Sequence, residues 1–160
     1  CVTNSVPLTH MRQKRGEGMI RKLTREDYAK LYSLWAETAG MGLRSVDDSP
    51  EGIERFLARN PDTCFAAEEK GELVGAIICG HDGRRGYIYH TAVRESLRGQ
   101  GIGKGLVEKA LAALKEKGIT RCGLFVYADN VSGQDFWRSQ GWVTRPDLVY
   151  FNLPLDPENL

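Results

Sequence analysis

The stretch Arg98-Gly99-Gln100-Gly101-Ile102-Gly103-Lys104 combines closely spaced glycines with a basic residue at each end. A run typical of a β-strand, residues 86–93, precedes it, and a segment with apolar residues at helical spacing follows it as far as Gly118. A strand, a glycine-rich turn and a helix in this order bring unpaired backbone N–H groups together at the start of the helix, where the helix dipole favours negative charge. Because glycine has no Cβ to obstruct an anion, the stretch predicts a cradle for a diphosphate.

The spacing of the glycines separates this stretch from two other phosphate-binding motifs. The dinucleotide-binding fingerprint is G-x-G-x-x-G, whereas the glycines here lie at positions 99, 101, 103 and 105. The nucleotide P-loop is G-x-x-x-x-G-K-[ST], but Gly105 follows Lys104 and Arg98 stands where the first glycine should be. A nucleotide-binding domain is therefore disfavoured, while a turn that merely joins a strand to a helix remains an alternative.

The pattern that does fit is R-x-x-G-x-G, formed by Arg98, Gly101 and Gly103, and here the chain resembles the GNAT acyltransferase superfamily. Residues 130–142 are similar to a second pattern of that family, N-x-x-x-x-x-[LF]-Y-x-x-x-G-F. The resemblance extends from residue 19 to about residue 155. It implies an acetyl-CoA-dependent N-acetyltransferase in which the glycine-rich turn holds the pyrophosphate of the cofactor.

The resemblance also implies which residues contact the cofactor. In this family the strand before the turn bulges and splays away from a neighbouring strand, here the one with Phe125 and Tyr127, and the pantetheine arm lies in the gap. A backbone N–H freed by the bulge can stabilise the negative charge that develops during acetyl transfer, and losing one such donor typically costs about 3 to 4 kcal/mol. The expected cofactor-binding residues are Thr91, Ala92, Val93, Arg98, Gly99, Gln100, Gly101, Ile102, Gly103, Lys104, Asn130 and Trp137. No metal site is expected.

Two positions depart from the pattern of the family's protein N-terminal acetyltransferases. Those enzymes carry a tyrosine that protonates the leaving thiolate, and Trp137 stands at this position. They also carry a glutamate base five residues before the asparagine, and here that residue is Phe125. Because an indole N–H is too weak an acid and a phenyl ring accepts no proton, we expect other side chains to transfer protons.

The candidates for proton transfer are Tyr127, Tyr89 and His90. Tyr127 lies two residues after Phe125 and shares its face if the strand alternates regularly. Tyr89 lies on the preceding strand, where resemblance to the arylalkylamine acetyltransferases places their proton-relay histidines. Histidine suits proton transfer near neutral pH, but alternation turns His90 to the opposite face unless a bulge re-aims it. Tyr127 is the first choice, and a packing role competes for each of the three.

The order of predicted elements, β-α-α-β-β-β-α-β-α-β-β, indicates an α/β (α+β) fold with a mixed, mostly antiparallel sheet of about seven strands flanked by helices. Ser49-Pro50-Glu51 is predicted to start the second helix. The polar residues 1–18 are predicted to be an extension ahead of one domain at residues 19–160. The predicted strands are residues 19–23, 63–69, 73–80, 86–93, 120–128, 142–144 and 148–153, of which the last two form a terminal hairpin.

The composition narrows the range of partners. The chain of 160 residues has 22 basic and 21 acidic side chains and a formal net charge of +1, so no strong field for nucleic acid follows. No apolar run approaches the roughly 20 residues of a membrane span. The four cysteines form no C-x-x-C pair and are expected to be reduced core residues, which favours a cytoplasmic location. A homodimer is an open option.

The predicted function is acetyl-CoA-dependent N-acetylation of a primary amine on a small molecule or a peptide. Trp35, residues 41–48 and the terminal hairpin are expected to select the acceptor, since loop-rich parts diverge among relatives. The alternative is a non-catalytic acyl-CoA sensor or interaction module, which the two departures from the family pattern favour slightly.

Overall fold

A computed structural model of the protein describes residues 19–160, and the predicted extension at residues 1–18 lies outside the described part. The strands are β1 (Met19–Lys22), β2 (Phe65–Glu69), β3 (Glu72–His81), β4 (Gly86–Val93) and β5 (Cys122–Leu124). The α-helices are α1 (Tyr28–Ala36), α2 (Pro50–Arg59), α3 (Ile102–Glu116) and α4 (Val131–Ser139). Short 3-10 turns, η1 (Arg25–Asp27) and η2 (Glu95–Leu97), precede α1 and α3.

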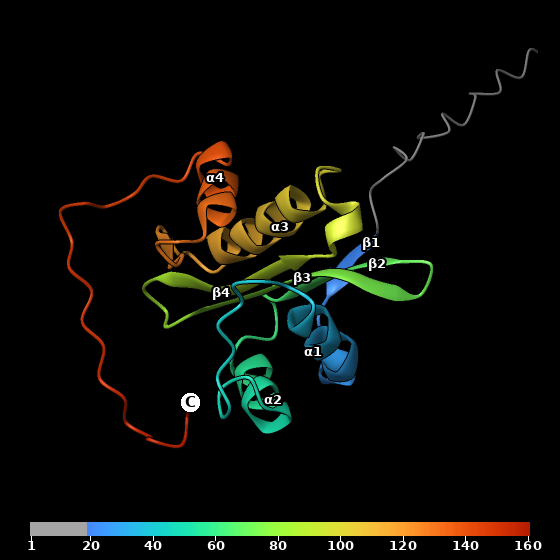
Figure 1. Ribbon diagram of the computed structural model, residues 1–160, viewed down its shortest axis with the longest axis horizontal. Coiled ribbons are helices and arrows are strands. Elements are labelled where there is room, and N and C mark those ends of the chain that lie inside the picture. The colour runs from blue at the N-terminus through green and yellow to red at the C-terminus, as the bar shows by residue number, and fades with distance from the viewer. Residues whose placement is uncertain (1–18) are drawn as a thin grey trace, which may run out of the picture.

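One sheet of five strands forms the middle layer, in the order β1-β2-β3-β4-β5. Neighbouring strands are antiparallel except β4 and β5, which are parallel. Figure 1 shows α3 and α4 on one face of this sheet and α1 and α2 on the other. The predicted class, a mixed and mostly antiparallel sheet flanked by helices, is therefore confirmed.

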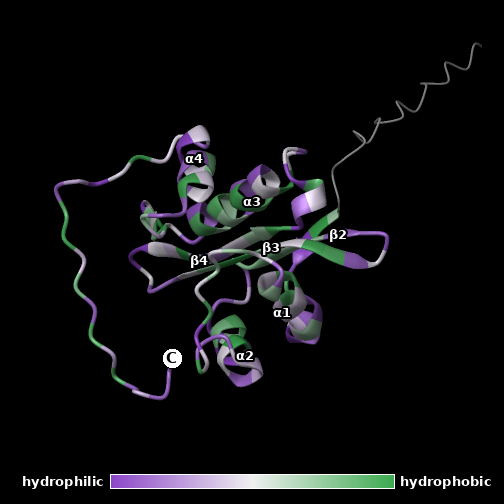
Figure 2. Cartoon of the chain, viewed as in Figure 1, coloured by the Kyte–Doolittle hydropathy of each residue, from purple (hydrophilic) through white to green (hydrophobic). Residues whose placement is uncertain are grey.

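The prediction of about seven strands is wrong, because the terminal hairpin does not form. Residues 142–144 and 148–153 belong to no strand, and only Cys122–Leu124 is paired within the strand predicted at residues 120–128. Figure 2 shows hydrophobic and hydrophilic residues along this segment, which pairs with no strand. A strand-prone segment forms a strand only where a neighbour offers free N–H and C=O groups, and here the segment runs out past the end of the sheet (Figure 1).

We refer to residues 142–160 as the C-terminal segment. After leaving α4 it passes around the sheet and returns to the connection between α1 and α2 (Figure 1). There the Ser45 N–H donates to the Leu160 carbonyl at 2.8 Å, and the Val46 N–H donates to the Asn159 side-chain oxygen at 3.0 Å. These hydrogen bonds tie the loop ahead of α2 to the last residues of the chain.

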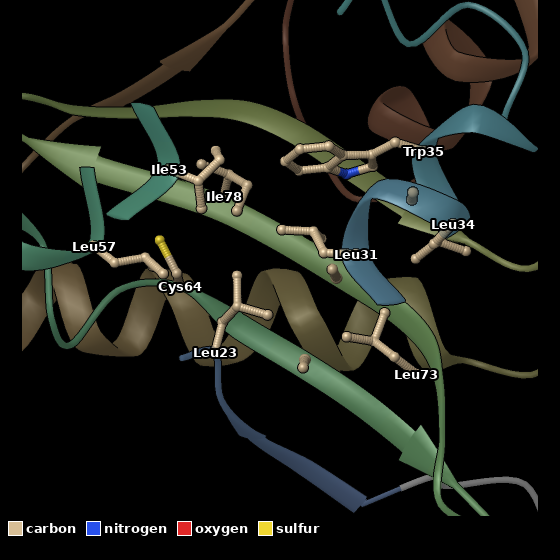
Figure 3. Close-up of a cluster of buried hydrophobic side chains, with 12 residues drawn as sticks. Leu23, Leu31, Leu34, Trp35, Ile53, Leu57, Cys64, Leu73 and Ile78 are labelled. Atoms are coloured by element: carbon tan, nitrogen blue, oxygen red, sulfur yellow. The ribbon is translucent and has the colours of Figure 1, made fainter. Parts of the chain in front are cut away.

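Two hydrophobic cores cover the two faces of the sheet. Under α1 and α2, Leu31 and Trp35 are fully buried in one cluster with Ile78 of β3 (Figure 3). On the other face α3 presents a buried stripe at helical spacing, formed by Ile102, Leu106, Val107, Ala110 and Leu114. Each fully buried large aliphatic side chain stabilises the fold by about 1.5–3 kcal/mol. The sheet is therefore held from both sides, which positions the ends of β4 and β5.

A β-bulge in β4 changes the direction of its side chains. The pairing register with β3 shifts between Ile78 and Cys79, which leaves Tyr89 as an extra residue in β4. A bulge lets two successive side chains turn to the same face. Tyr89 contacts a ring of α2 and His90 contacts a ring of α1, so both lie on the face that these helices cover. Regular alternation would have placed His90 on the opposite face from Tyr89, and the bulge places both on the same face.

Candidate active site

The glycine-rich turn leads directly into the N-terminus of α3. Gly99 and Gly101 have positive φ angles of 74° and 89°, a left-handed conformation that glycine adopts without strain. No side chain caps this helix, so its first backbone N–H groups have no side-chain partner. A Cβ at either glycine would meet no atom within 4 Å, which means that the turn opens to solvent. An anion can therefore approach the start of α3 without obstruction.

The other residues of the turn have different neighbours. The Nε of Arg98 donates to the Val93 carbonyl at 3.0 Å, which uses one of the five guanidinium donors. Lys104 is exposed, and its nearest carboxylate is one helical turn further along α3, at 3.8 Å. A Cβ at Gly103 would lie 3.1 Å from the Phe136 ring, so this glycine permits close packing of α3 against α4. Gly103 therefore allows this packing in addition to the cofactor contact that the motif predicts.

The side chains of the remaining predicted cofactor residues near the turn vary in exposure. Ala92 and Ile102 are buried in the cores, so only their backbone can contact a cofactor, whereas Gln100 is exposed. The Thr91 hydroxyl is buried and has no hydrogen-bond partner among residues 19–160. An unpaired buried hydroxyl costs about 1–3 kcal/mol, which a bound polar group would recover.

β4 and β5 separate part of the way along β4, before the turn. Their pairing covers Gly86–Ile88 and Cys122–Leu124 and stops there. From Tyr89 to Val93, the edge of β4 that would continue toward β5 has no strand partner. Backbone N–H and C=O groups along such an edge can pair with an extended ligand.

These features fit acetyl-CoA, the cofactor that the resemblance implies. The open turn and the uncapped start of α3 suit a diphosphate. The unpartnered edge of β4 suits an extended arm with amide groups, and the Thr91 hydroxyl lies on that strand. The described residues therefore offer polar groups suited to the diphosphate and to the amide groups of the extended arm.

On the other face, the bulge brings His90 against the loop ahead of α2. His90 Nε2 and Asp48 Oδ1 are 2.8 Å apart, and their side chains are only 12% and 7% exposed. The second oxygen of Asp48 accepts the Arg44 N–H at 2.7 Å, and the Trp35 ring meets the imidazole edge-on at a centroid distance of 5.0 Å. Because a carboxylate at Nε2 holds the proton there, Nδ1 is the nitrogen that can accept another proton.

Sequence reasoning did not identify Asp48 as a partner of His90. The two residues are 42 positions apart. The sequence analysis included Asp48 only as the last residue of the loop at residues 41–48, which was expected to select the acceptor. An acidic residue at the end of a loop, just ahead of a helix start, usually belongs to the helix cap. The bulge in β4 and the packing of α2 are what join the pair.

Tyr127 also reaches the connection between α1 and α2. Its hydroxyl lies against Gly42, and its side chain is about half exposed. Gly42 has a positive φ of 63°, so a side chain at this position would strain the backbone and collide with the tyrosine. The structure thus brings Tyr127 and Asp48 to the same loop, on the side of the sheet where His90 lies.

Asn130 and Trp137, both predicted to contact the cofactor, have structural contacts of their own. Asn130 Oδ1 accepts the Gly133 N–H at 2.9 Å and so caps α4. Trp137 lies between Phe136 and Trp142, with ring centroids 5.0 and 5.1 Å away. This aromatic cluster belongs to the core under α3. Contact with the cofactor stays a prediction for both residues.

A row of aromatic rings runs from α2 across β4 to the residue after β5 and on to the C-terminal segment. The row consists of Phe56, Tyr89, Tyr87, Phe125 and Tyr150, with successive centroid distances of 5.4, 5.1, 5.2 and 4.2 Å. Although Tyr89 is more than half exposed, desolvation of its phenol raises the pKa of this group, and a nearby aspartate raises it further. Its phenol therefore stays protonated at neutral pH and can act as a donor but not as a base. Sequence analysis missed this row because four separate segments contribute to it.

Two open cavities lie beside α1, and neither is lined by a residue of the aromatic row. One of about 420 Å³ lies between α1 and the connection to α3 and is lined by Leu34, Glu37, Thr38, Arg94, Glu95 and Ser96. The other, of about 410 Å³, is lined by Tyr28, Tyr32, Leu43, Arg44, Ser45, Asp48, Ser49, Pro50 and Leu160. In residues 19–160, no three His, Cys, Asp or Glu side chains are grouped as metal ligands, and no helix is long and apolar enough to span a membrane.

Comparison with known proteins identifies relatives over most of the chain. The model of the Acetyltransferase (GNAT) family matches residues 20–142. An acetyltransferase of Sodalis glossinidius is 36% identical over 111 residues, which are 69% of this chain and 77% of that protein. An acetyltransferase of Pectobacterium atrosepticum is 35% identical over 111 residues, with the same two coverages of 69% and 77%.

Several solved structures share the fold. Ard1 from Thermoplasma volcanium has a TM-score of 0.70 at 22% identity, over 79% of this chain and 83% of that one. The PaiA N-acetyltransferase from Thermoplasma acidophilum, solved in complex with coenzyme A, has a TM-score of 0.66 at 23% identity, over 76% and 86%. An aminoglycoside acetyltransferase from an uncultured soil metagenomic sample has a TM-score of 0.69 at 24% identity, over 89% and 99%.

Proposed function

Since the chain belongs to the GNAT acetyltransferase family, we propose that its acceptor is the primary amine of a small molecule or a peptide. The enzyme is an acetyltransferase, and acetyl-CoA is its acetyl donor. The observation that best supports an amine acceptor is the His90–Asp48 pair, which lies where β4 and β5 separate. A primary amine is largely protonated in neutral water and must lose a proton before it attacks, and a carboxylate-bound imidazole can accept that proton.

On the cofactor side, bound acetyl-CoA supplies the thioester carbonyl that the amine attacks. The N–H groups at the start of α3 bind the diphosphate, and Arg98 and Lys104 add positive charge beside it. The unpartnered backbone between Tyr89 and Val93 binds the extended arm and donates to the negative charge that develops on the carbonyl oxygen. Holding the two reactants together supplies a large part of the rate enhancement.

On the acceptor side, His90 is the proposed base. Asp48 holds its Nε2–H, which orients the ring and leaves Nδ1 to take the proton of the amine. Tyr127 is the proposed donor to the thiolate of the leaving CoA, because its hydroxyl lies at the loop that carries Asp48. Tyr89 is the second candidate donor, since a phenol is protonated at neutral pH and the pKa of Tyr89 is raised further. With these groups, the enzyme does not need a proton donor at Trp137.

The alternative of a non-catalytic acyl-CoA sensor is not retained. Curated relatives at 36% and 35% identity are acetyltransferases, and they match most of the chain. The features that favoured a sensor were Phe125 and Trp137 in place of the usual proton-transferring residues. The His90–Asp48 pair now offers another route for the proton.

A panel of amines tests the proposed function. Polyamines, amino acids, aminoglycosides and short peptides are each incubated with the enzyme and acetyl-CoA, and the free thiol of CoA is measured. We expect amine-dependent thiol release well above the hydrolysis of acetyl-CoA alone, and the acetylated amine as the product in mass spectrometry. Thiol release that no amine increases, or acetyl transfer to a hydroxyl instead, would rule out the proposed acceptor class.

A further inference from the structure

The loop that carries Asp48 is hydrogen-bonded to the end of the C-terminal segment. The Ser45 N–H donates to the Leu160 carbonyl at 2.8 Å, and the Leu160 N–H donates to the Ser45 hydroxyl at 2.9 Å. The same hydroxyl donates to the Glu158 carbonyl at 2.6 Å. Because Ser45 and Leu160 exchange hydrogen bonds in both directions, the two segments lie side by side in a fixed register.

The Asn159 side chain adds three hydrogen bonds to this contact. Its oxygen accepts the N–H groups of Val46 and Asp47 at 3.0 and 3.2 Å. Its Nδ2 donates to the Asp47 carboxylate at 2.8 Å, and a hydrogen bond to a charged group is stronger than one between neutral groups. Both polar atoms of the Asn159 amide are therefore bound to the loop.

The first turn of α2 holds the same loop from its other side. A Cβ at Gly52 would collide with the carbonyl oxygens of Val46 and Asp47, so both carbonyls lie directly against this turn of the helix. The N–H groups of the same two residues bind Asn159. Residues 46 and 47 are thus held between α2 and Asn159.

Asp48 belongs to the turn that these contacts hold. Its backbone N–H donates to the Arg44 carbonyl at 3.1 Å, and its Oδ2 accepts the Arg44 N–H at 2.7 Å. These two bonds close residues 44–48 into one turn, and the two residues that Asn159 binds lie within it. The other oxygen, Oδ1, lies 2.8 Å from His90 Nε2. A shift of residues 46 and 47 would therefore move the Asp48 carboxylate relative to His90.

An open cavity beside the turn increases the importance of these hydrogen bonds. Asp48 and Leu160 both line the cavity of about 410 Å³. Close-packed side chains would hold a loop by contact alone, whereas a loop beside an open cavity has room to move. Residues 37–49 also contain no helix or strand, and Gly40 and Gly42 near their start have positive φ angles. The position of the turn therefore depends on its hydrogen bonds to the C-terminal segment.

We propose that Asn159 is a positioning residue for the transfer of the acceptor's proton. Asn159 holds residues 46 and 47, and their turn holds the Asp48 carboxylate at His90 Nε2. Asn159 acts through Asp48, since its side chain binds the loop and not the imidazole. This inference rests on the proposed function, in which His90 accepts the proton of the amine, and it extends that site to the C-terminal segment.

Exchanging the side chains of Asn159 and Asp47 tests the contact in the full chain. Asn159→Asp keeps an oxygen for the two N–H groups but places a second carboxylate beside Asp47, so the turn should shift. We expect kcat to fall on the order of tenfold while the affinity for acetyl-CoA stays unchanged. Adding Asp47→Asn restores a donor and an acceptor in exchanged positions, so the double variant should recover kcat. Asn152→Asp is the matched control, because Asn152 is an exposed asparagine of the same segment whose side chain accepts from Tyr150.

A second measurement observes His90 itself and needs no substrate. Nuclear magnetic resonance of the histidine ring nitrogens follows the signals of His90, which His90→Gln identifies by their loss. We expect these signals to shift in Asn159→Asp toward those of a histidine in water and to return in the double variant. They should stay in place in Asn152→Asp. The pH profile of kcat/KM should change in the same variants.

The outcomes separate this inference from the proposed function. Unchanged His90 signals and an unchanged pH profile in Asn159→Asp overturn the inference, even if thermal unfolding shows a loss of stability, because Asn159 is then only structural. A loss of kcat that Asp47→Asn does not reverse overturns it as well. His90 signals that shift and recover in a protein that acetylates no amine support the positioning contact and contradict the proposed function. If Asn159→Asp fails to fold, Asn159→Ala removes the same three hydrogen bonds without adding charge and must shift the His90 signals in the same direction.

Discussion

The proposed cofactor side and the proposed acceptor side of this enzyme are built in different ways. The proposed cofactor side, residues 93–105, is formed by the backbone of consecutive residues, namely by the positive φ angles of Gly99 and Gly101 and by the uncapped start of α3. The acceptor side is made of side chains from distant segments, as in the 2.8 Å contact of Asp48 with His90, 42 positions away. The first side therefore depends on local backbone conformation, and the second depends on how several elements pack together.

This difference leads to different kinetic expectations. A backbone site acts on the binding of acetyl-CoA, so a change there should alter affinity before anything else. A site made of proton-transferring side chains acts in the transition state, so a change there should lower kcat and leave the affinity for acetyl-CoA nearly constant. The following variants test that separation.

Gly101→Glu should have the largest effect, the loss of acetyl-CoA binding by a factor on the order of 100 or more. The carboxylate would stand at the start of α3, where it repels the diphosphate and occupies its place. Calorimetry measures the affinity. Gly83→Glu is the matched control, since Gly83 has a φ of 87° and, like Gly101, no atom within 4 Å of an added Cβ, but lies in the turn after β3. Unchanged affinity in folded Gly101→Glu would refute the cradle.

Asp48→Asn should lower kcat by a factor on the order of 100 through His90, with little change in acetyl-CoA affinity. An amide cannot hold the Nε2–H as a carboxylate does, so the pH dependence of kcat/KM should change as well. Asp27→Asn is the control, because Asp27 is 7% exposed and Asp48 is 6% exposed. Asp27 binds Arg21 instead, at 2.8 Å.

The control should cost about 1–3 kcal/mol of folding free energy and leave kcat intact. Thermal unfolding of both variants checks this. If Asp48→Asn loses stability to the same extent as Asp27→Asn but keeps its kcat and pH profile, Asp48 is structural and does not position His90.

Tyr127→Phe should lower kcat by a factor on the order of 100 while the affinity for acetyl-CoA stays nearly constant. The substitution keeps the ring against the Gly42 backbone and removes only the hydroxyl. Steady-state kinetics with a saturating amine measures the effect, and Tyr32→Phe, an exposed tyrosine of α1, is the control. A change in affinity alone would assign Tyr127 a packing role.

Trp137→Phe should have the smallest effect, a change in kcat of less than about threefold, because the indole takes no part in proton transfer. Its ring packs on Trp142, so Trp142→Phe, which trims the same cluster, should behave alike. Both variants are compared at saturating acetyl-CoA. A loss of a hundredfold or more in Trp137→Phe alone, the size of a general-acid effect, would return this residue to the mechanism.

The features that sequence reasoning predicted correctly depend on neighbours a few residues away. The turn at residues 98–104 adopts its conformation because glycine tolerates positive φ. Likewise α2 begins where Ser49-Pro50 predicted, with the Ser49 hydroxyl accepting the Gly52 N–H at 3.0 Å. Such local interactions are present in the sequence itself, so they can be recognised without knowing the fold.

The predicted terminal hairpin, by contrast, is wrong, because it depended on pairing with a distant strand. Residues 148–153 are rich in residues that favour strands, but their side chains remain exposed and no strand pairs with them. Residue preference indicates that a segment could form a strand, but pairing also requires a free strand edge at the right distance. After β5, Phe125 contacts Tyr150 and Tyr127 contacts Gly42, so these residues do not extend the sheet. The edge that β5 offers for pairing is therefore short.

The sequence by itself determined the order of most elements, the start of α3 and the glycines of the turn, because these follow from local conformational preference. The tertiary structure alone decided that Tyr89 is the extra residue in β4, that His90 meets Asp48, and that an aromatic row crosses from α2 to the C-terminal segment. One residue added to a strand reverses the face of every side chain beyond it. The direction of His90 therefore depends on how β3 pairs with β4, which no stretch of neighbouring residues specifies.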